Sequence, residues 1–339
     1  MKPRAAANAT YFSDATMVSV IIPTYNRAKM VVKCVQSVLA SEGADVEVIV
    51  VDDCSSDDTM DRIEERFGND PRVKCVRTPE NRLTSGARNF GAGYARGDYL
   101  LFLDNDNEIA QGAIAFLVEY IAANPGVKLV APISAHCRQD GSHLIWTLGC
   151  GYNPWTSMVR EFYPHTRLED LQSDAMMPEL YPTAYAPNAF MVRRADFLSA
   201  GGFDEGYGMQ YEEADFGLRV TANNPNLGMI CAKAVTRHHG YLDPAEVGEL
   251  RALGVGNVRR AYCFGRNRVK FARRHFAWYQ ALVVALVFAP LSAVWYGKVA
   301  LKNRRPDIAW AYLKGTIAGI FGLYGTKLYG GGQWRKVNS

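Results

Sequence analysis

The sequence predicts an α/β fold in which a mostly parallel sheet carries helices on both faces. Short runs of apolar, β-branched residues alternate with stretches of helical periodicity along residues 17–132. Acidic residues directly follow two of these runs, at Asp52-Asp53 and at Asp104-Asn105-Asp106. Hydrophobic residues make up 48% of the 339 residues, which is enough for a sizeable core.

The predicted elements follow one another as strand and helix, an order typical of parallel βαβ units with right-handed crossovers. Strands are expected at residues 18–22, 46–51, 73–76, 99–104 and 127–131, and helices at 27–40, 57–67, 81–95 and 111–123. Residues 132–182 lack a regular pattern, so we expect a long loop rich in aromatic residues. Regular structure resumes with a strand within 184–193, a helix from Tyr211 and a strand at 228–234.

Charge and cysteine content narrow the class of protein. The formal net charge of +4 is small for this length and does not indicate a nucleic-acid partner. The seven cysteines are scattered, without a C-x-x-C pair, which is typical of reduced thiols in a cytosolic protein. Residues 1–16 lack the apolar segment of a signal peptide, and we expect them to be a flexible lead.

Two carboxylates with one residue between them, Asp104 and Asp106, end a buried strand. At the C-terminal end of a parallel strand, such a pair points into the crevice where open α/β sheets bind ligands. Carboxylate oxygens suit Mg²⁺ or Mn²⁺, and either ion can carry a substrate diphosphate. A helix-capping aspartate beside a solvated one is the alternative, and the short motif alone does not exclude it.

Four motifs are similar, in sequence, order and spacing, to those of the inverting family 2 glycosyltransferases. They are Val20-Ile-Ile-Pro-Thr-Tyr-Asn26, Val51-Asp-Asp-Cys-Ser-Ser-Asp57, Leu101-Phe-Leu-Asp-Asn-Asp106, and Gly202-Phe-Asp-Glu205 followed by Tyr211-Glu-Glu-Ala-Asp215. Cys54 departs from the usual glycine, and Glu213 stands where aspartate is commoner. The last motif and the basic C-terminal region resemble rhamnosyl- and galactofuranosyltransferases of the family.

The resemblance implies a GT-A fold, the nucleotide-diphospho-sugar transferase architecture, and a division of the chain. Residues 17–245 would be the catalytic domain, with a nucleotide-binding half at 17–132 and an acceptor half at 133–245. Residues 246–339 would form a basic and apolar helical region. The implied reaction is metal-dependent and moves one hexosyl or rhamnosyl group from a UDP-, dTDP- or GDP-sugar. Its acceptor would be a hydroxyl of a glycan or polyprenyl-linked molecule in cell-envelope polysaccharide or glycoconjugate synthesis.

The donor site would lie at the ends of the first strands. Asp53, with Asp52 behind it, can accept hydrogen bonds from a pyrimidine ring and the ribose hydroxyls. A helix cap is the alternative for Asp53, and a solvated helix charge is the alternative for Arg88. The full set expected to contact the nucleotide sugar or support its site is Pro23, Tyr25, Arg27, Asp52, Asp53, Arg88, Asn89, Asp104 and Asn105.

The resemblance also assigns the metal and the general base. Asp104 and Asp106 would hold Mn²⁺ or Mg²⁺ together with His238, for which the adjacent His239 is an alternative. We expect Glu212 to be the general base, kept ionised by the N-terminus of the helix it opens. Glu213 completes the catalytic pair and is expected to orient the acceptor or the helix.

The aromatic residues between Trp146 and Tyr163 suit stacking on an acceptor sugar. Hydrophobic plugs beneath a long loop are the alternative for the same residues. The sequence Gly332-Gln-Trp-Arg335 differs from the Q-x-x-R-W motif of processive synthases, which favours transfer of a single sugar.

The C-terminal region contains a basic run at 259–274 and two apolar stretches, 276–297 and 308–324. The first stretch is long enough to cross a bilayer, which takes about 20 helical residues. Basic residues flank it on both sides, however, and Pro290 interrupts it. We therefore expect two interfacial or re-entrant helices on the cytoplasmic face of the cell membrane, with basic residues on anionic lipid headgroups.

Other interpretations of the chain remain open. The apolar stretches could instead form a hairpin packed on the catalytic domain or on a second subunit of a homo-oligomer, or a two-pass hairpin. A nucleotidyltransferase would share the acidic sheet edge, but it usually has a glycine-rich, lysine-containing loop where Pro23-Thr-Tyr-Asn26 stands. A non-catalytic sugar-binding module would keep the fold without needing Asp104, Asp106 and Glu212 together.

Overall fold

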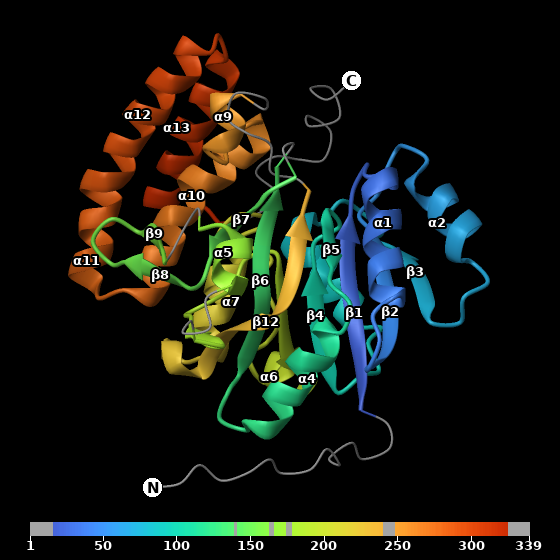
Figure 1. Cartoon of the computed structure of the whole chain (residues 1–339). Helices are drawn as coiled ribbons and strands as arrows, with labels where there is room; N and C mark the ends of the chain where they lie inside the picture. Colours follow the sequence, from blue (N-terminus) through green and yellow to red (C-terminus); the bar gives the residue numbers. More distant parts are fainter. Residues whose placement is uncertain (1–15, 139–140, 163–165, 174–177, 240–247, 325–339) are drawn as a thin grey trace, which may run out of the picture.

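The computed structural model describes residues 16–138, 141–162, 166–173, 178–239 and 248–324. Most of the expected flexible lead, Tyr163 of the aromatic segment and the Gly332–Arg335 motif lie outside these residues. The seven cysteines all lie within them, and none forms a disulfide. Figure 1 shows a central sheet with helices on both faces and a group of C-terminal helices beside it.

The N-terminal half is a parallel sheet in the order β4-β1-β2-β3. Its strands are β1 (Met17–Thr24), β2 (Asp45–Asp52), β3 (Val73–Arg77) and β4 (Tyr99–Leu103). The connecting helices are α1 (Ala28–Leu39), α2 (Thr59–Phe67) and α3 (Leu83–Ala92). The alternation predicted from the sequence is confirmed here, because each apolar run forms a strand and each periodic stretch a helix.

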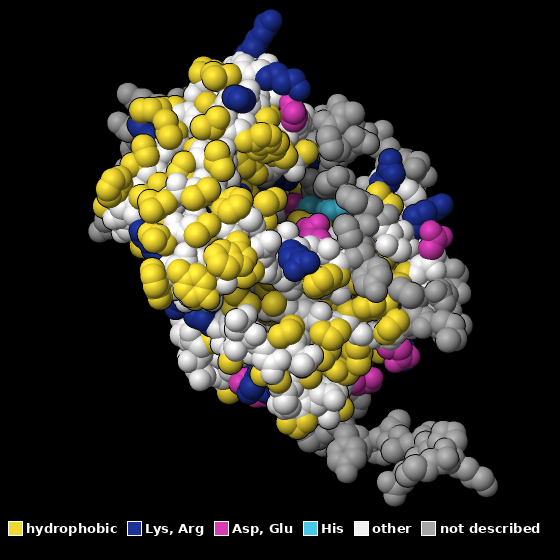
Figure 2. Space-filling model, turned by 90° about the vertical axis from the view of Figure 1, so that its left-hand side faces the viewer, with side chains coloured by type: hydrophobic (Ala, Val, Ile, Leu, Met, Phe, Trp, Pro, Cys, Tyr) yellow, Lys and Arg dark blue, Asp and Glu magenta, His cyan; other side chains and the backbone are white. Residues whose placement is uncertain are grey.

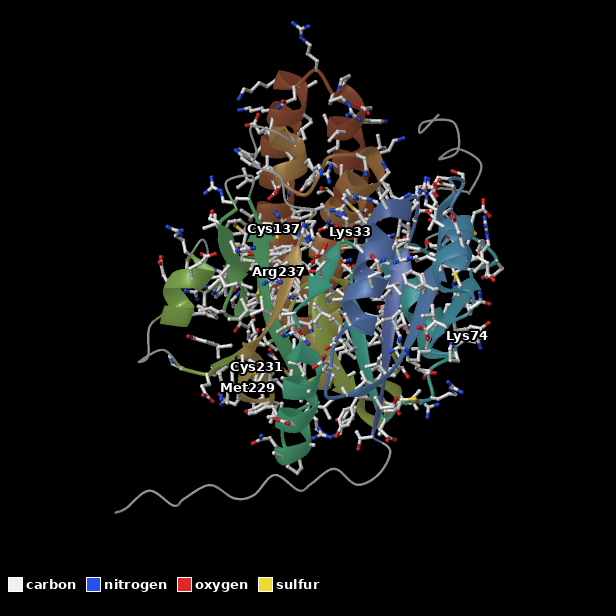
Figure 3. All side chains as sticks on the ribbon, turned by 45° about the vertical axis from the view of Figure 1, so that its right-hand side comes forward. Lys33, Lys74, Cys137, Met229, Cys231 and Arg237 are labelled. Carbon is white, nitrogen blue, oxygen red and sulfur yellow. The ribbon has the colours of Figure 1, made fainter. Side chains whose placement is uncertain are left out.

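Beyond β4 the sheet becomes mixed. Strand β11 (Ala189–Arg193) runs antiparallel between β4 and β6 (Leu129–Cys137), and it is shorter than the strand expected within 184–193. Strand β12 (Gly228–His238) pairs parallel with β6 and antiparallel with β5 (Asn107–Ile109). Figure 3 shows Cys137 at the end of β6 and Arg237, Cys231 and Met229 along β12, with Lys74 on β3 at the other edge.

The expectation of one long irregular loop at 132–182 was wrong. This segment contains the second half of β6 together with β7 (His143–Thr147), β8 (Cys150–Asn153), β9 (Met158–Glu161), α5 (Leu168–Ser173) and β10 (Leu180–Pro182). Strand β7 pairs with β6, β8 pairs with β9, and β10 pairs with β12. These strands are too short for a visible alternation, so pairing with a partner strand rather than local pattern determines them.

Two layers of buried side chains hold helices on the two faces of the sheet. Neighbouring residues of β1 point to opposite faces, as the pleat requires. Val20 and Ile22 pack in the layer that contains residues of α1 and α4 (Ala113–Ala123). Ile21 packs in the other layer with residues of α3, α6 (Arg194–Ser199) and α7 (Glu212–Val220). The sheet is therefore covered on both faces, as predicted.

The C-terminal helices are α9 (Glu249–Ala252), α10 (Val258–His275), α11 (Trp278–Val283), α12 (Ala289–Lys302) and α13 (Pro306–Ile320). Pro290 does not interrupt the first apolar stretch, which corrects that expectation. A π-helical turn, η2 (Val284–Phe288), precedes the proline and makes 278–302 one continuous apolar helix. Pro290 lies in the first turn of α12 and has no N–H to donate. The π-helical turn before it changes the hydrogen-bond pattern so that no donor is needed at this position.

Helix α13 packs closely on α10 through glycines on both helices. A Cβ added at Gly265 would lie 2.6 Å from the carbonyl oxygen of Tyr312, and one at Gly319 would lie 2.7 Å from that of Arg266. A Cβ at Gly315 would collide with the carbonyl oxygen of Tyr262. The backbones therefore approach more closely than any other residue would allow, and α13 packs on protein rather than standing apart from it.

We expect Gly315→Ala to lower the free energy of unfolding by about 1–3 kcal/mol, because the added methyl group overpacks this crossing. Gly297→Ala in α12 is the matched control, since no atom lies within 4 Å of its Cβ position. Alanine favours a helix over glycine by about 1 kcal/mol, so the control should be neutral or stabilised. Denaturant unfolding of both variants checks this, and equal stabilities would contradict the crossing described here.

Candidate active site

A cavity of about 640 Å³ opens at the carboxyl ends of β1, β2 and β4, and we call it the cleft. Some of its lining residues follow these strands, and others come from the start of α7 and from α10 and α12. Nine residues expected at the site line it: Pro23, Tyr25, Arg27, Asp53, Asp104, Asn105, Asp106, Glu212 and Glu213. Four others do not line it directly: Asp52, Arg88, Asn89 and His238.

Arg88 lies beneath the cleft and is fully buried, which excludes a solvated helix charge. Its Nη2 donates to Asp104 Oδ1 at 2.7 Å and to Glu213 Oε1 at 2.6 Å, and its Nη1 lies 3.9 Å from Glu212 Oε1. Burial alone would lower the pKa of Arg88, but the three carboxylates raise it above its ordinary value. One guanidinium thus joins the carboxylate after β4 to the pair that opens α7.

Glu212 is protonated more readily than the sequence led us to expect. Burial and the neighbouring Glu213 carboxylate raise the pKa of Glu212 to about 8, and the charge of Arg88 only partly offsets them. Burial likewise raises the pKa of Glu213, which also accepts a hydrogen bond from the Asn188 N–H at 3.2 Å. The expectation that the helix N-terminus keeps Glu212 ionised was therefore wrong, because desolvation outweighs the helix dipole here.

Asp53 and Asp52 take different roles. Asp53 accepts hydrogen bonds from Thr78 Oγ1 and from the N–H groups of Arg82 and Leu83, at 2.8–2.9 Å, so it orders the start of α3. Burial raises the pKa of Asp53, and these hydrogen bonds oppose the rise. Asp52 is fully buried and accepts from the Ser55 N–H at 3.1 Å. Only Asp53 faces the cleft.

Two asparagines of the expected donor site make structural hydrogen bonds. The Asn89 side chain donates to the Phe203 carbonyl and accepts from the Phe203 N–H, both at 2.9 Å. It therefore fixes the turn before α7 from behind the cleft. Asn105 lines the cleft, and its Nδ2 donates to the Pro23 carbonyl at 3.0 Å, which ties the end of β4 to the end of β1.

His238 rather than His239 lies beside the acidic pair. His238 Nε2 is 3.3 Å from Asp106 Oδ1, whereas His239 Nε2 is 3.1 Å from Glu108 Oε1. Burial would raise the pKa of Asp106, but the hydrogen bond to His238 lowers it below its ordinary value. Pairing of β12 with β5 places His238 opposite Asn107 and so brings the two side chains together.

The aromatic residues after Trp146 divide between the cleft and the core. Trp146 lines the cleft, its Nε1 donates to Glu161 Oε1 at 2.9 Å, and its ring lies 5.6 Å from that of His238. Tyr152 also reaches the cleft but is packed against the rings of Tyr185 and Phe271, at 5.3 and 4.5 Å. Trp146 is therefore placed to contact a ligand, whereas Tyr152 mainly supports the wall.

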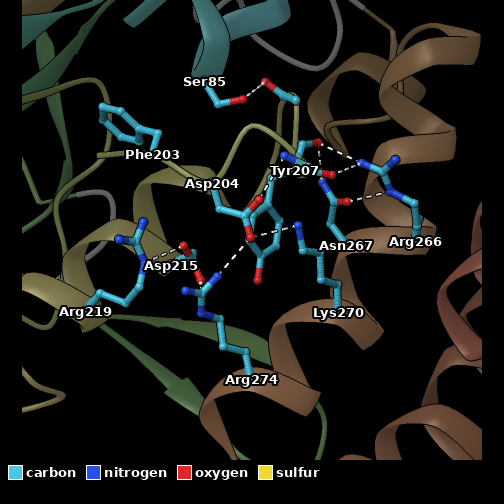
Figure 4. A network of polar contacts seen from close by, with 12 residues as sticks. Ser85, Phe203, Asp204, Tyr207, Asp215, Arg219, Arg266, Asn267, Lys270 and Arg274 are labelled. Carbon is cyan, nitrogen blue, oxygen red and sulfur yellow. Dashed lines mark hydrogen bonds and ion pairs between the residues drawn. The ribbon is translucent and has the colours of Figure 1, made fainter. Parts of the chain in front are cut away.

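Helix α10 fixes the loop that leads into Glu212, a support that the sequence did not reveal (Figure 4). Fully buried Asn267 donates to the carbonyls of Tyr207, Met209 and Gln210 at 2.8–2.9 Å. Gln210 and Tyr211 both have positive φ angles, near 70°, a conformation that side chains other than glycine adopt at a cost. The carbonyl contacts hold the loop in this shape and so fix where α7 begins.

Further residues of the cleft were missed because the sequence was read as a basic membrane-binding run. Arg259, Arg260 and Arg268 of α10 line the cleft. Arg268 and Arg266 are 5% and 2% exposed, so they are not available to lipid headgroups as expected. The basic run that contains them has the amphipathic period of a helix that packs on the catalytic domain. This period is the feature of the sequence that could have indicated their burial.

A model of the family "Glycosyl transferase family 2" matches residues 19–178, which include both acidic strand ends of the cleft. Residues 19–178 belong to glycosyl transferase family 2. This family 2 segment ends before α7, so Glu212 and α10 lie beyond the match.

Curated relatives carry transferase names. The chain is 30% identical over 152 residues to a hyaluronan synthase of Pasteurella multocida, covering 45% of this chain and 15% of that protein. It is 36% identical over 109 residues to a GalNAc(5)-diNAcBac-PP-undecaprenol beta-1,3-glucosyltransferase of Campylobacter jejuni, covering 32% of this chain and 35% of that protein. The alignments thus span well under half of the length of these relatives.

Solved structures of low identity share the fold. The crystal structure of GalNAc-T7 with UDP, GalNAc and Mn²⁺ aligns with a TM-score of 0.59 at 17% identity, covering 93% of this chain and 59% of that one. The chain therefore has the GT-A fold that the resemblance of its motifs predicted. Its helices α10–α13 lie beyond the family match, and side chains of α10 and α12 line the cleft.

Proposed function

We propose that this protein is a metal-dependent inverting glycosyltransferase with its catalytic domain at residues 17–245. It would move one sugar from a nucleotide-diphospho-sugar to a hydroxyl of a glycan or polyprenyl-linked acceptor. The observation that carries the proposal is Arg88, which joins Asp104 of the acidic strand end to the buried pair Glu212 and Glu213. Donor-binding carboxylates and a candidate base thus face one cleft. Relatives named as a hyaluronan synthase and a glucosyltransferase support the same conclusion.

The acidic corner fits a divalent metal in its chemistry. Asp106 and His238 offer a carboxylate oxygen and an imidazole nitrogen 3.3 Å apart, a donor set suited to Mn²⁺. Among the described residues no group of three or more acidic, histidine or cysteine side chains could hold a metal alone. Donor phosphate oxygens and water would therefore complete the ligand set. The bound metal would act as a Lewis acid on the diphosphate leaving group.

The other side chains of the cleft would bind the nucleotide, accept the proton and position the base. Asp53, at the end of β2, is placed to accept hydrogen bonds from the base or ribose, beside Pro23 and Tyr25. Glu212 in its carboxylate form would accept the proton of the acceptor hydroxyl as that oxygen attacks the anomeric carbon opposite the diphosphate. Glu213 is bound to Arg88 and so keeps Glu212 in position. In-line attack of this kind inverts the configuration of the sugar.

Activity should depend on the protonation of Glu212. We expect kcat/KM to rise with pH and to level off above about pH 8, because only the carboxylate accepts a proton and burial raises its pKa to about 8. Below this pKa, the rate should fall about tenfold per pH unit. Initial rates across the range, with donor integrity checked at each pH, test this. A profile that is flat between about pH 6 and 8 would contradict the role of Glu212.

Nucleotide binding tests the proposal. Titration calorimetry of the full chain with UDP, dTDP and GDP should show that one of them binds in the presence of Mn²⁺ or Mg²⁺ and not in EDTA. Asp106→Ala should abolish this binding, whereas the exposed Asp58→Ala should not. Two results would contradict the proposal: formation of diphosphate from a nucleoside triphosphate, which indicates a nucleotidyltransferase, or metal-independent sugar binding without nucleotide, which indicates a sugar-binding module.

We also propose that the C-terminal helices rest on the cytoplasmic face of a lipid membrane. The 278–302 helix is long and apolar enough to span a bilayer, with 22% of its most apolar window buried. Figure 2 shows a broad hydrophobic surface over these helices, with lysine and arginine side chains at its edges. Its most exposed large side chains include Trp278, Leu286, Leu291, Leu301, Trp310 and Phe321. Apolar and aromatic side chains beside cations suit an anionic bilayer surface.

Vesicle sedimentation tests this orientation. The protein should pellet with phosphatidylglycerol vesicles more than with phosphatidylcholine vesicles, and the double variant Leu286→Glu/Leu291→Glu should stay in solution. Leu198→Glu, in α6, is a control because Leu198 is 61% exposed, as Leu291 is, but lies on the catalytic domain. Equal sedimentation of both variants would overturn the proposal. A dimer lost in the double variant, without vesicle binding, would instead show that the helices cover a second copy.

A further inference from the structure

Arg268 of α10 is a buried cation that the proposed sugar transfer does not use. Its side chain lines the cleft, although the residue is only 5% exposed. Among the described residues no carboxylate forms an ion pair with it. Arg88 differs, since three carboxylates surround that fully buried guanidinium. A buried charge without an opposite charge is costly, and buried charges in proteins are usually paired.

The contacts of Arg268 leave part of its guanidinium without an acceptor. Nη1 donates to the Ser292 hydroxyl of α12, and the guanidinium carbon lies 5.5 Å from the centre of the Phe264 ring. Nε is buried and has no hydrogen-bond partner. Nearby phenol groups of Tyr211 and Tyr296 offer neutral polar surface rather than a negative charge. An incoming anion could accept from donors of this fork in a planar geometry.

Arg268 lies near both the start of α7, where the acceptor would react, and the helix that carries the proposed membrane face. Tyr211, which lines the cleft with it, immediately precedes Glu212. Tyr296 and Ser292 belong to α12, and the same helix exposes Leu291 and Trp295 on the apolar surface. Asp106 and His238, the proposed metal corner, belong instead to the β5–β12 side of the cleft. An anion at Arg268 would therefore sit beside the apolar surface and apart from the donor diphosphate.

We propose that Arg268 binds a phosphate group of the acceptor, as carried by a polyprenyl phosphate or diphosphate. This inference rests on the proposed transferase function and names the acceptor class. A neutral glycan would leave the charge of Arg268 uncompensated, whereas a lipid-linked phosphate supplies the opposite charge. Its isoprenoid chain would continue over α12 into the bilayer, and its reacting hydroxyl would lie toward Glu212. Ser292 and Tyr296 complete the phosphate site from α12.

Farnesyl diphosphate is a short, soluble probe for this site. We expect the full chain to bind it, measured by calorimetry in detergent below the critical micelle concentration. Arg268→Gln should weaken binding about ten- to a hundredfold, since hydrogen bonds to a charged group are lost. Three comparison ligands separate the contributions to binding. Farnesol tests the isoprenoid chain, inorganic diphosphate tests the phosphate, and phosphatidylglycerol vesicles test a general lipid headgroup. Arg251→Gln, an exposed arginine of α9, is the matched control and should bind as the wild type does.

Ser292→Asp keeps the test decisive if Arg268→Gln does not fold. It places a carboxylate against the Arg268 guanidinium, so it should preserve or increase stability while it abolishes binding of farnesyl diphosphate. Metal-dependent nucleotide binding should remain in both variants. If the wild type itself does not bind nucleotide in the presence of metal, the transferase function is refuted instead. Wild-type affinity for farnesyl diphosphate in Ser292→Asp would overturn the site. So would equal binding of farnesol and farnesyl diphosphate, or loss of nucleotide rather than farnesyl diphosphate in Arg268→Gln.

Discussion

Glu212→Gln should lower kcat by about 10²–10⁴-fold, the usual contribution of a general base. The amide is nearly the same size but cannot accept a proton from the acceptor hydroxyl. Nucleotide binding should be unchanged, because the residues proposed to hold the nucleotide follow β1, β2 and β4, whereas Glu212 opens α7. Stability should be retained or raised, since Glu212 and Glu213 share Arg88 and their carboxylates repel each other.

Kinetics and calorimetry together check this result. Glu119→Gln in α4 is the matched control, since Glu119 is an exposed glutamate outside the cleft. The control should keep the wild-type kcat and the rising pH profile, whereas Glu212→Gln should lose both. A Glu212→Gln enzyme with kcat within a factor of about three of the wild type would assign the base to another residue.

Arg88→Met should be the most destabilising single change in the catalytic domain, at about 3–5 kcal/mol. The methionine fills much of the volume but leaves the carboxylates of Asp104, Glu212 and Glu213 together without their cation. Activity should fall with stability, because the same guanidinium positions both the strand-end aspartate and the start of α7. Denaturant unfolding followed by circular dichroism measures the loss in free energy of unfolding.

Two further variants separate this effect from the general loss of an ion pair. Arg62→Met removes an exposed pair with Asp58 and should cost about 0–1 kcal/mol. Adding Glu213→Gln to Arg88→Met should recover part of the stability, since one of the repelling carboxylates is neutralised. If Arg88→Met is as stable as Arg62→Met, the buried cluster is not held together by this arginine.

The sequence was sufficient for the parts of the site that follow buried strands. Asp53, Asp104 and Asp106 come directly after apolar runs, and parallel pairing brings such strand ends to one edge. The aromatic segment was misjudged because β7–β10 are three to five residues long and are defined by their pairing, β7 with β6, β8 with β9 and β10 with β12. Local pattern carries no information on such pairing.

Burial explains the remaining differences. Arg88 and Arg268 have the sequence context of surface helix charges, and only the packing of α3 and α10 shows that both are buried. The pKa of Glu212 follows from the same cause, because burial raises it and Arg88 of α3, which partly offsets the rise, is distant in the sequence. His238 and His239 differ by one position, and only the register of β12 with β5 separates them.

Release of nucleoside diphosphate from a nucleotide sugar tests the central claim most directly. The full chain would be incubated with UDP-, dTDP- and GDP-sugars and Mn²⁺ or Mg²⁺, with and without EDTA, beside Asp106→Ala and Glu212→Gln. We predict metal-dependent release from one donor class, lost in Asp106→Ala and strongly reduced in Glu212→Gln. Release that survives both EDTA and Asp106→Ala would contradict the account. So would the absence of release from every donor when lipid-linked phosphate acceptors are supplied.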